Sequence, residues 1–326
     1  MTHGRREFSV LTHNTYFGAD LRPVIAATSP QEVIAAVTEA WSHVQASKIP
    51  ERALKIAQAI ARVQPDLVGL QEIVQLFHGP FDRMTLEYDF LDLILEALRA
   101  HGVAYSIVAI QNDFDQPIPA SADGIFFRFV DRHAVLVRTT PASSIQPLRI
   151  HSGTFQNLHP LGESGLLAVP RSWIAVDAKV GAAEFRFIES HIESYEAGVQ
   201  LAQAGELIAG PANIERPVVM VGDFNSNGNQ DPAVLDCTPT YPALIGAGFR
   251  DSWAVVNPGD LGNTGVQAAD LRNPESTLDR RIDLILVRGE AVSVSATLVN
   301  ATPDARTASG LWPSDHAGVL ATLAIR

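Results

Sequence analysis

Two short apolar runs that border polar residues constrain the fold of this chain more than any other feature. The first run, residues 218–222, reads Val-Val-Met-Val-Gly and leads directly into Asp223 and Asn225. The second run begins at residues 317–319, Ala-Gly-Val, and directly follows Asp315 and His316. A short run rich in β-branched and aliphatic residues, bounded by polar residues, predicts a buried strand. Because strand ends are rigid and the adjoining loops admit ligands, polar side chains at these positions are well placed for catalysis.

Four further segments combine an apolar run with polar residues in the same way. In order they are Leu11-Thr12-His13-Asn14, Pro65-Asp66-Leu67-Val68-Gly69-Leu70-Gln71-Glu72, Ile188-Glu189-Ser190-His191 and Arg281-Ile282-Asp283-Leu284-Ile285-Leu286. With the first two, these segments span residues 11–319, which is nearly the whole chain. The ordered set therefore carries far more weight than any single motif within it.

The ordered set resembles the signature motifs of the endonuclease/exonuclease/phosphatase superfamily. Its members include pancreatic-type deoxyribonucleases, apurinic-site endonucleases, neutral sphingomyelinases and inositol polyphosphate phosphatases. The resemblance implies an α/β fold, a four-layer α/β/β/α sandwich of two packed, mainly antiparallel sheets with outer helices. It also implies a single domain over residues 1–326, with the site at one edge of the two sheets. Strand pattern alone favours two packed sheets but leaves several β-rich folds open.

Local patterns predict the individual elements. Helices are predicted over residues 30–47, 51–63, 86–100, 196–208 and 240–247. Strands are predicted over residues 8–12, 67–73, 104–110, 124–130, 133–139, 172–180, 184–191, 217–222, 282–287, 292–299 and 317–325.

Composition limits the class of protein and of partner. Hydrophobic residues make up 46% of the 326 residues, which is enough for a sizeable core, and the formal net charge is −12. An acidic surface disfavours tight, nonspecific attachment to DNA, although a local basic groove remains compatible with it.

No segment reaches the roughly 20 apolar residues of a membrane helix. We expect a soluble protein, either cytoplasmic or the mature form of an exported one, with no obligatory protein partner. Cys237 is the only cysteine, so no intramolecular disulfide is expected.

The resemblance implies a divalent metal ion held by oxygen ligands. Glu72 matches the principal metal ligand of the family, Asn14 the asparagine beside metal and phosphate, and Asp315 a second carboxylate associated with the metal. Mg²⁺ suits such a site because it prefers oxygen ligands and keeps several waters, so one or two carboxylates suffice. Mn²⁺ is a possible substitute, and no Cys/His cluster with zinc spacing is present.

The resemblance also implies the catalytic residues. His316 is the best candidate for a general base, because the pKa of histidine lies near neutrality, and Asp283 matches the aspartate that orients it. Asp223 and Asn225 are two residues apart, so on an extended segment they face the same side and can position water and phosphate. His191 matches a phosphate-binding histidine.

Structural roles for these residues remain open from sequence alone. Asp223 and Asn225 also suit a turn after a strand. Asp283 has possible ion-pair partners in Arg280 and Arg281. A histidine at a strand end, such as His191, is usually structural, and if it is functional, Glu189 and Glu193 are the candidates to tune it.

Specificity is expected to lie in the segments between the motifs. A helical insertion is predicted over about residues 20–48, as a lid or as an extra packing helix. Long site loops are predicted over about residues 112–123, 151–170 and 254–278. Arg171 begins a strand after the second loop, where it either contacts substrate phosphate or is solvated.

These observations favour a metal-dependent phosphodiester hydrolase. A nuclease would need a basic groove with interleaved aromatic residues, and no such cluster is evident. A sphingomyelin diesterase would need exposed apolar residues, for which Phe126, Phe127 and Phe129 are candidates, although a half-buried strand also explains them. An inositol-phosphate phosphomonoesterase would need several basic residues, such as Arg128, Arg132 and Arg171, to converge. A catalytically inactive binding module is the alternative of a different class.

Overall fold

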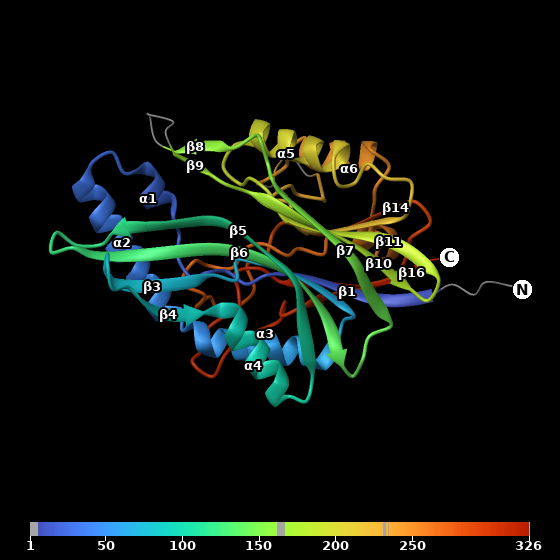
Figure 1. Cartoon of the computed structure of the whole chain (residues 1–326), viewed down its shortest axis with the longest axis horizontal. Helices are drawn as coiled ribbons and strands as arrows, with labels where there is room; N and C mark the ends of the chain where they lie inside the picture. The colour runs from blue at the N-terminus through green and yellow to red at the C-terminus, as the bar shows by residue number, and fades with distance from the viewer. Residues whose placement is uncertain (1–5, 162–166, 231–232, 234, 326) are drawn as a thin grey trace, which may run out of the picture.

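The chain folds into two packed β-sheets with helices on both outer faces, as Figure 1 shows. This computed structural model describes residues 6–161, 167–230, 233 and 235–325. Helices α5 (Ala197–Ala209) and α6 (Thr240–Gly246) lie on one outer face, and α3 (Ile49–Val63) and α4 (Phe90–Ala100) lie on the other. The predicted four-layer α/β/β/α sandwich is therefore confirmed.

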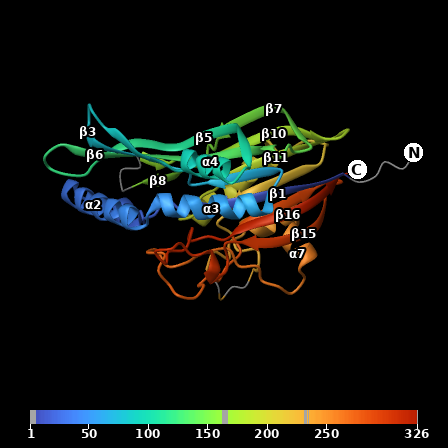
Figure 2. The same ribbon diagram turned by 90° about the horizontal axis from the view of Figure 1, so that it is seen from below.

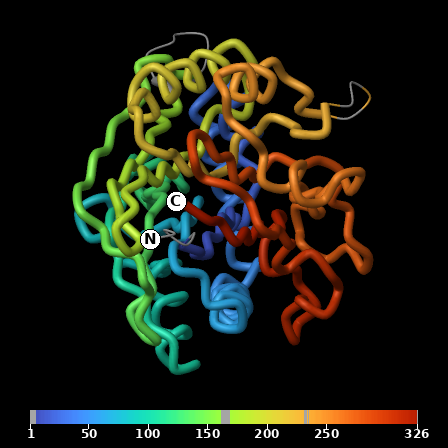
Figure 3. The backbone as a smooth tube through the Cα atoms, turned by 90° about the vertical axis from the view of Figure 1, so that its right-hand side faces the viewer, coloured from blue at the N-terminus to red at the C-terminus, as the bar shows by residue number. Residues whose placement is uncertain are grey.

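The larger sheet has the order β15-β16-β1-β2-β6-β3-β4, with β5 paired to β6. Its strands are β1 (Arg6–Asn14), β2 (Leu67–Gln71), β3 (Gln75–Pro80), β4 (Thr85–Asp89), β5 (Ala104–Pro119), β6 (Ile125–Thr140), β15 (Val292–Val299) and β16 (Gly318–Ile325). The β1–β2 pair is parallel, whereas β1 and β16 are antiparallel. As a result, the start of β1 and the end of β16 lie side by side (Figure 3).

The second sheet has the order β13-β14-β12-β11-β10-β7. Its strands are β7 (Ile145–Thr154), β10 (Ser172–Val180), β11 (Ala183–His191), β12 (Val218–Asp223), β13 (Arg250–Asp251) and β14 (Asp283–Arg288). β11 and β12 are parallel, and β10 and β11 form the predicted hairpin around Gly181. Two short strands, β8 (His159–Leu161) and β9 (Leu167–Val169), pair outside both sheets.

Three apolar layers hold the sandwich together. Phe8, Phe187 and Val219 belong to the layer between the two sheets. Ile56 of α3 joins a layer outside the larger sheet, and Leu207 of α5 joins one outside the second sheet. Continuous apolar runs form the central strands β2, β12 and β14, and apolar residues recur at helical spacing in α3, which is why sequence patterns located most of these elements.

Strand register carries the predicted site residues to one end of the sandwich. In the second sheet, Asp223 is paired with His191 of β11 on one side and with Asp283 of β14 on the other. In the larger sheet, Asn14 is paired with Gln71. Glu72 follows β2 directly, and residues 315–316 shortly precede β16. The polar motifs therefore occupy neighbouring strand ends in both sheets.

Several predicted elements differ from the structure. Residues 86–89 belong to β4 and not to the predicted helix 86–100, because they pair with β3. The predicted strands 124–130 and 133–139 are one strand, β6. Residues 112–119 of the predicted loop 112–123 belong to β5, since β6 continues far enough to pair with them.

Other expected loops were only partly correct. Residues 151–154 of the predicted loop 151–170 belong to β7, residues 159–161 and 167–169 form β8 and β9, and residues 162–166 lie outside the described part. In the predicted loop 254–278, the first residues end helix α7 (Ser252–Val256), and the rest has no helix or regular strand.

The predicted helical segment 20–48 contains α1 (Arg22–Ala26) and α2 (Pro30–Ala46). Figure 2 shows α2 beside those ends of β3 and β6 that lie farthest from α7. Trp41 of α2 stacks on Phe127, with ring centroids 4.4 Å apart, and on His78. These contacts pack α2 against β3 and β6. Phe126, Phe127 and Phe129, which the sequence offered as contacts for a lipid, are all partly buried, as is usual for a half-buried strand.

None of the described helices is both long and apolar enough to cross a lipid bilayer.

His13 is buried in the neutral form, which makes folding stability depend on pH. Its Nδ1 donates to the Asn14 carbonyl at 2.6 Å, and Asn300 lies 3.3 Å from its Nε2. Burial lowers its pKa from 6.5 to about 4, although the bond to Asn14 opposes this shift.

We expect wild type to lose stability in acid faster than a His13→Asn variant does. Because the folded-state pKa is depressed, this stabilisation is complete above pH 6.5 and is lost as the pH falls towards 4. The loss amounts to about 3 kcal/mol. Urea unfolding of both proteins across this range measures it, and parallel pH profiles would contradict the prediction.

Candidate active site

Asn14 joins the two sheets at the centre of the site. Its side-chain amide donates to Glu72 Oε1 and to Asp223 Oδ2, each at 3.0 Å. Its Oδ1 accepts from the backbone N–H of Tyr16 at 2.9 Å. The other oxygen of Glu72 accepts from the backbone N–H of Phe17 at 3.0 Å. Both carboxylates are thereby held in fixed orientations by neutral donors.

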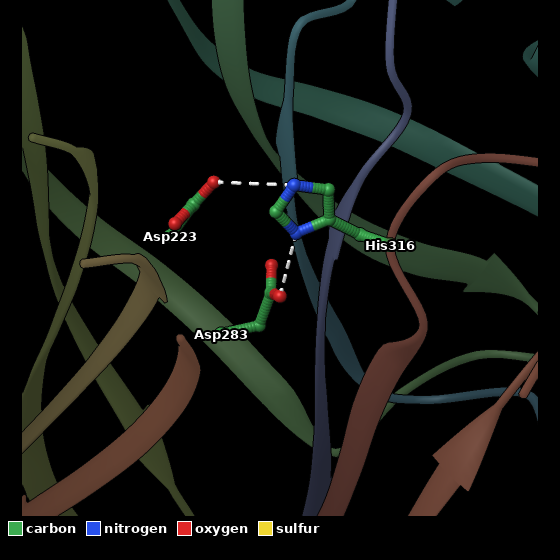
Figure 4. Close-up of side chains that lie close together, drawn as sticks. All are labelled: Asp223, Asp283 and His316. Atoms are coloured by element: carbon green, nitrogen blue, oxygen red, sulfur yellow. Dashed lines mark hydrogen bonds and ion pairs between the residues drawn. The ribbon is translucent and has the colours of Figure 1, made fainter. Parts of the chain in front are cut away.

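His316 and Asp283 form a buried pair beside Asp223. His316 Nδ1 lies 2.8 Å from Asp283 Oδ2, and His316 Nε2 lies 3.8 Å from Asp223 Oδ2 (Figure 4). The backbone N–H of Asp283 donates to Thr264 Oγ1 at 3.0 Å. Asp283 therefore fixes the imidazole so that its second nitrogen faces Asp223.

The carboxylates around His316 dominate its electrostatics. Burial alone would lower the pKa of His316, but Asp283, Asp315 and Asp223 raise it well above 6.5. Burial also raises the pKa of Asp223 and of Asp315 to about 7, although His316 opposes both shifts. Nearby Glu72 raises the pKa of Asp315 further. The protein therefore supplies too little positive charge near these buried carboxylates to keep them fully ionised.

This donor set fits a hard divalent cation. Asp223, Asp283 and His316 each offer a ligand atom, and the three atoms lie within 4.8 Å of one another. Asp283 Oδ1 is buried without a hydrogen-bond partner. Glu72 and Asp315 supply further carboxylate oxygens nearby, and oxygen ligands are those that Mg²⁺ and Mn²⁺ prefer. A cation here would also offset the buried negative charge.

His191 lies on the other side of Asp223. Its Nε2 is 3.5 Å from Asp223 Oδ2 and 3.2 Å from Asn225 Nδ2, so both residues reach His191. Arg171 Nη1 lies 3.1 Å from His191 Nδ1 and 3.7 Å from Asp131 Oδ2. Burial and the charge of Arg171 hold the pKa of His191 well below 6.5. His191 is therefore neutral.

Two site residues have unusual backbone conformations. Glu72 has a φ of 56° and Asn225 a φ of 46°, both in the left-handed region that non-glycine residues rarely adopt. Such conformations persist where the surrounding structure imposes them, and they are common at functional sites. Each turns the chain sharply where a buried strand ends.

The partners considered from the sequence for Asp283 and His191 are not those observed. Arg281 pairs with Asp251 and Arg280 with Asp236, so neither is the partner of Asp283. Neither glutamate considered for His191 bonds to it. Glu189 contacts His133, and Glu193 accepts from the Tyr195 backbone.

Arg128, Arg132 and Arg171 do not converge on one pocket. They pair with Asp115, Asp89 and Asp131 respectively, on different parts of the fold. Of the three, Arg171 is the one in contact with a predicted site residue, and it is buried, not solvated.

Two contributors were missed from the sequence. Asp131, within β6, holds Arg171, and the backbone of Phe17 holds Glu72. Neither belongs to a recognisable motif, so no sequence signal identified them.

A cavity of about 370 Å³ adjoins Asn225. Tyr195, Gln200 and Cys237 are among its lining residues, so it combines polar and apolar surface.

Comparison with known proteins identifies the class to which this fold and site belong. The sequence matches the Endonuclease/Exonuclease/phosphatase family over residues 11–316, and the chain belongs to that family. No curated protein sequence matches this chain. The resemblance inferred from the ordered motifs is therefore confirmed at the level of the family.

Solved structures share the fold. An endonuclease/exonuclease/phosphatase family protein from Bacteroides thetaiotaomicron has 18% sequence identity, a TM-score of 0.59, and a match covering 99% of this chain and 100% of that chain. One from Beutenbergia cavernae has 19% identity and a TM-score of 0.60, covering 98% and 72%. TDP2 from Caenorhabditis elegans has 18% identity and a TM-score of 0.55, covering 98% and 74%. The family includes metal-dependent phosphoesterases, so membership supports a hydrolase of phosphoesters.

Proposed function

We propose that this protein is a phosphodiester hydrolase that depends on a divalent metal ion. The single observation that carries the proposal is the bridge from Asn14 to Glu72 and Asp223, beside the His316–Asp283 pair. It supports the proposal because carboxylate oxygens and a paired imidazole meet at one end of the sandwich.

The metal is proposed to lie near Glu72 and Asp315, with Asn14 beside it, and not within the Asp223, Asp283 and His316 group, because a metal there would occupy the nitrogen of His316 that is needed as a base. The Asn14 amide orients the two carboxylates that it bridges, and its Oδ1, which accepts one hydrogen bond, keeps a second lone pair. A bound Mg²⁺ or Mn²⁺ would neutralise charge on the phosphoryl oxygens and on the leaving group.

The protein's own groups are proposed to act on water and phosphate. A bound cation would offset the carboxylates that raise the pKa of His316, so that His316 accepts a proton from the attacking water while Asp283 holds its ring in position. Asp223 orients the water, while Asn225 and neutral His191 donate hydrogen bonds to phosphoryl oxygens. Arg171 orients His191. Positioning and electrostatic stabilisation account for most of the rate enhancement in such reactions.

The substrate is proposed to be a diester. The separate ion pairs of Arg128, Arg132 and Arg171 argue against a converged set of arginines of the kind that an inositol-phosphate monoesterase would need. A small or lipid-derived diester with an uncharged side group suits the mixed cavity beside Asn225.

Metal removal tests the proposal. We expect hydrolysis of bis(p-nitrophenyl) phosphate with Mg²⁺ or Mn²⁺, and a loss of about 10²-fold or more after chelation, because metal stabilisation of transition-state charge contributes several kcal/mol. Readdition of the metal should restore the rate.

A substrate panel tests the diester preference. It contains p-nitrophenyl phosphate, DNA, RNA, sphingomyelin vesicles and inositol phosphates, each with and without chelator. Turnover of monoesters alone would contradict the diester proposal. Binding without turnover of any phosphoester would indicate an inactive binding module.

A further inference from the structure

A second buried polar network lies between the two sheets, directly behind the site. It runs from Gln71 of β2 through Glu189 of β11 and His133 of β6 to Ser172 of β10 and Asp113 of β5. Gln71 Nε2 donates to Glu189 Oε1 at 2.8 Å, and His133 Nε2 lies 2.7 Å from Ser172 Oγ. The network thus links three strands of the larger sheet with two of the second.

The network is closed to solvent and its bonds are complementary. The relative exposure is 0% for Gln71, Glu189 and Ser172, 1% for His133 and 9% for Asp113. Ser172 donates to Asp113, so its oxygen accepts from His133, whose other nitrogen donates to Glu189. Burial lowers the pKa of His133, but Glu189 and Asp113 raise it more, to about 9. A protonated ring supplies both donors.

The order Ser172–His133–Glu189 is that of a nucleophilic triad, but the structure excludes this role for it. The hydroxyl of Ser172 has no exposed surface and already donates to Asp113. A nucleophile must reach the substrate and release its proton to the neighbouring base. The network can therefore hold other groups in place but cannot itself react.

The members of the network adjoin residues of the site. Gln71 directly precedes Glu72, and Ser172 directly follows Arg171. Glu189 lies two residues before His191 on β11, so the two side chains point to the same face of the strand. Three strands that present site residues are therefore joined immediately behind those residues.

The neighbouring packing leaves room for this network. A Cβ atom at Gly69 of β2 would lie 2.7 Å from Cγ of Glu189, too close for a real contact. Only glycine at this position lets the glutamate side chain extend between the sheets to Gln71 and His133.

We propose that His133, Glu189 and Ser172 are positioning residues, which fix the relative placement of Glu72, Arg171 and His191 across the two sheets. Buried polar networks whose members are all bonded impose one arrangement on the elements they join. The inference rests on the proposed function, because the groups being placed are those of the hydrolytic site.

The test compares His133→Ala, His133→Asn and Ser172→Ala with wild type. Asparagine places a donor near the position of the lost Nδ1 and so keeps the bond to Glu189. Ser172→Ala removes only a hydroxyl and leaves His133 Nε2 facing Asp113 Oδ1, which are 3.8 Å apart. If His133→Ala does not fold, the Ser172→Ala variant still tests whether the network positions the site residues.

Asp177→Asn is the matched control. Asp177 of β10 is also buried, and its carboxylate lies 2.8 Å from Arg186 of β11. It therefore joins β10 and β11, two strands that the network also joins, but away from the site end. It should lower the melting temperature and leave kcat within about twofold, as expected for a substitution without contact to the site.

We expect His133→Ala to lower kcat for bis(p-nitrophenyl) phosphate about 10- to 100-fold, as for other residues that orient primary site groups. KM should change much less, and His133→Asn should recover part of the loss. Amide hydrogen exchange at residues 71–73, 171–173 and 189–192 should quicken in His133→Ala and Ser172→Ala but not in Asp177→Asn.

Unchanged kcat together with unchanged exchange in folded Ser172→Ala and His133→Ala would overturn the inference. A lowered melting temperature with unchanged kcat would also overturn it, because the network would then be purely structural. If wild type hydrolyses no phosphoester, the proposed function fails, and the exchange comparison still decides whether the network fixes these strand ends.

Discussion

A His316→Ala variant is expected to lose activity on a phosphodiester by about 10²- to 10⁴-fold in kcat, the usual contribution of a positioned general base. The reason is geometric, because Asp283 aims the free nitrogen of His316 towards Asp223. Steady-state kinetics at saturating metal and substrate measure the loss. KM should change little if the ring acts on water and not on substrate binding.

Asp283→Asn is the matched variant for this prediction. It keeps the shape of the side chain and removes the charge that holds His316, so kcat should fall without a loss of folding. Full activity in His316→Ala would refute the proposed base. Full activity in Asp283→Asn would show that the ring needs no carboxylate to orient it.

Replacing Gly222 by alanine is expected to have the largest effect on stability. Gly222 has a φ of 147°, and a Cβ atom there would lie 1.8 Å from the carbonyl oxygen of Ser190 in the neighbouring strand. The backbone of β11 or β12 would have to move just before Asp223. We expect the free energy of unfolding to fall by about 4 kcal/mol or more, at the extreme of single substitutions.

Gly205→Ala provides the control for this variant. Gly205 lies within α5, and no atom lies within 4 Å of an added Cβ. Alanine there should raise the free energy of unfolding by up to about 1 kcal/mol, because glycine is a poor helix former. Denaturant unfolding measures both variants. Equal effects at the two positions would mean that the contact with Ser190 relaxes at little cost.

The sequence was sufficient for the parts of the fold and site that depend on local pattern. Short apolar runs located β1 and β12, the glycine between two such runs located the β10–β11 hairpin, and helical spacing located α3. The polar residues that end these strands were recognisable because each follows a buried run. Asp283 was assigned to His316 by resemblance, and the 2.8 Å contact agrees with that assignment.

Long-range pairing explains what the sequence did not predict. Residues 86–89 read as the start of a helix, yet pairing with β3 makes them a strand. The partners of Arg171, His133 and Glu189 lie on other strands and are brought together only when the two sheets pack. No local pattern encodes such contacts, so a glutamate expected to tune His191 is bound to His133 instead.

The position of β16 has a consequence for synthesis of the protein. β16 lies between β15 and β1 in the larger sheet, although β1 covers residues 6–14 and β16 covers residues 318–325. During translation, one edge of β1 stays without its neighbour until nearly all the other elements have left the ribosome. Contacts of such large sequence separation form slowly. The nascent chain therefore carries an open, apolar strand edge for most of its synthesis, which is the state in which chaperones would be expected to bind it.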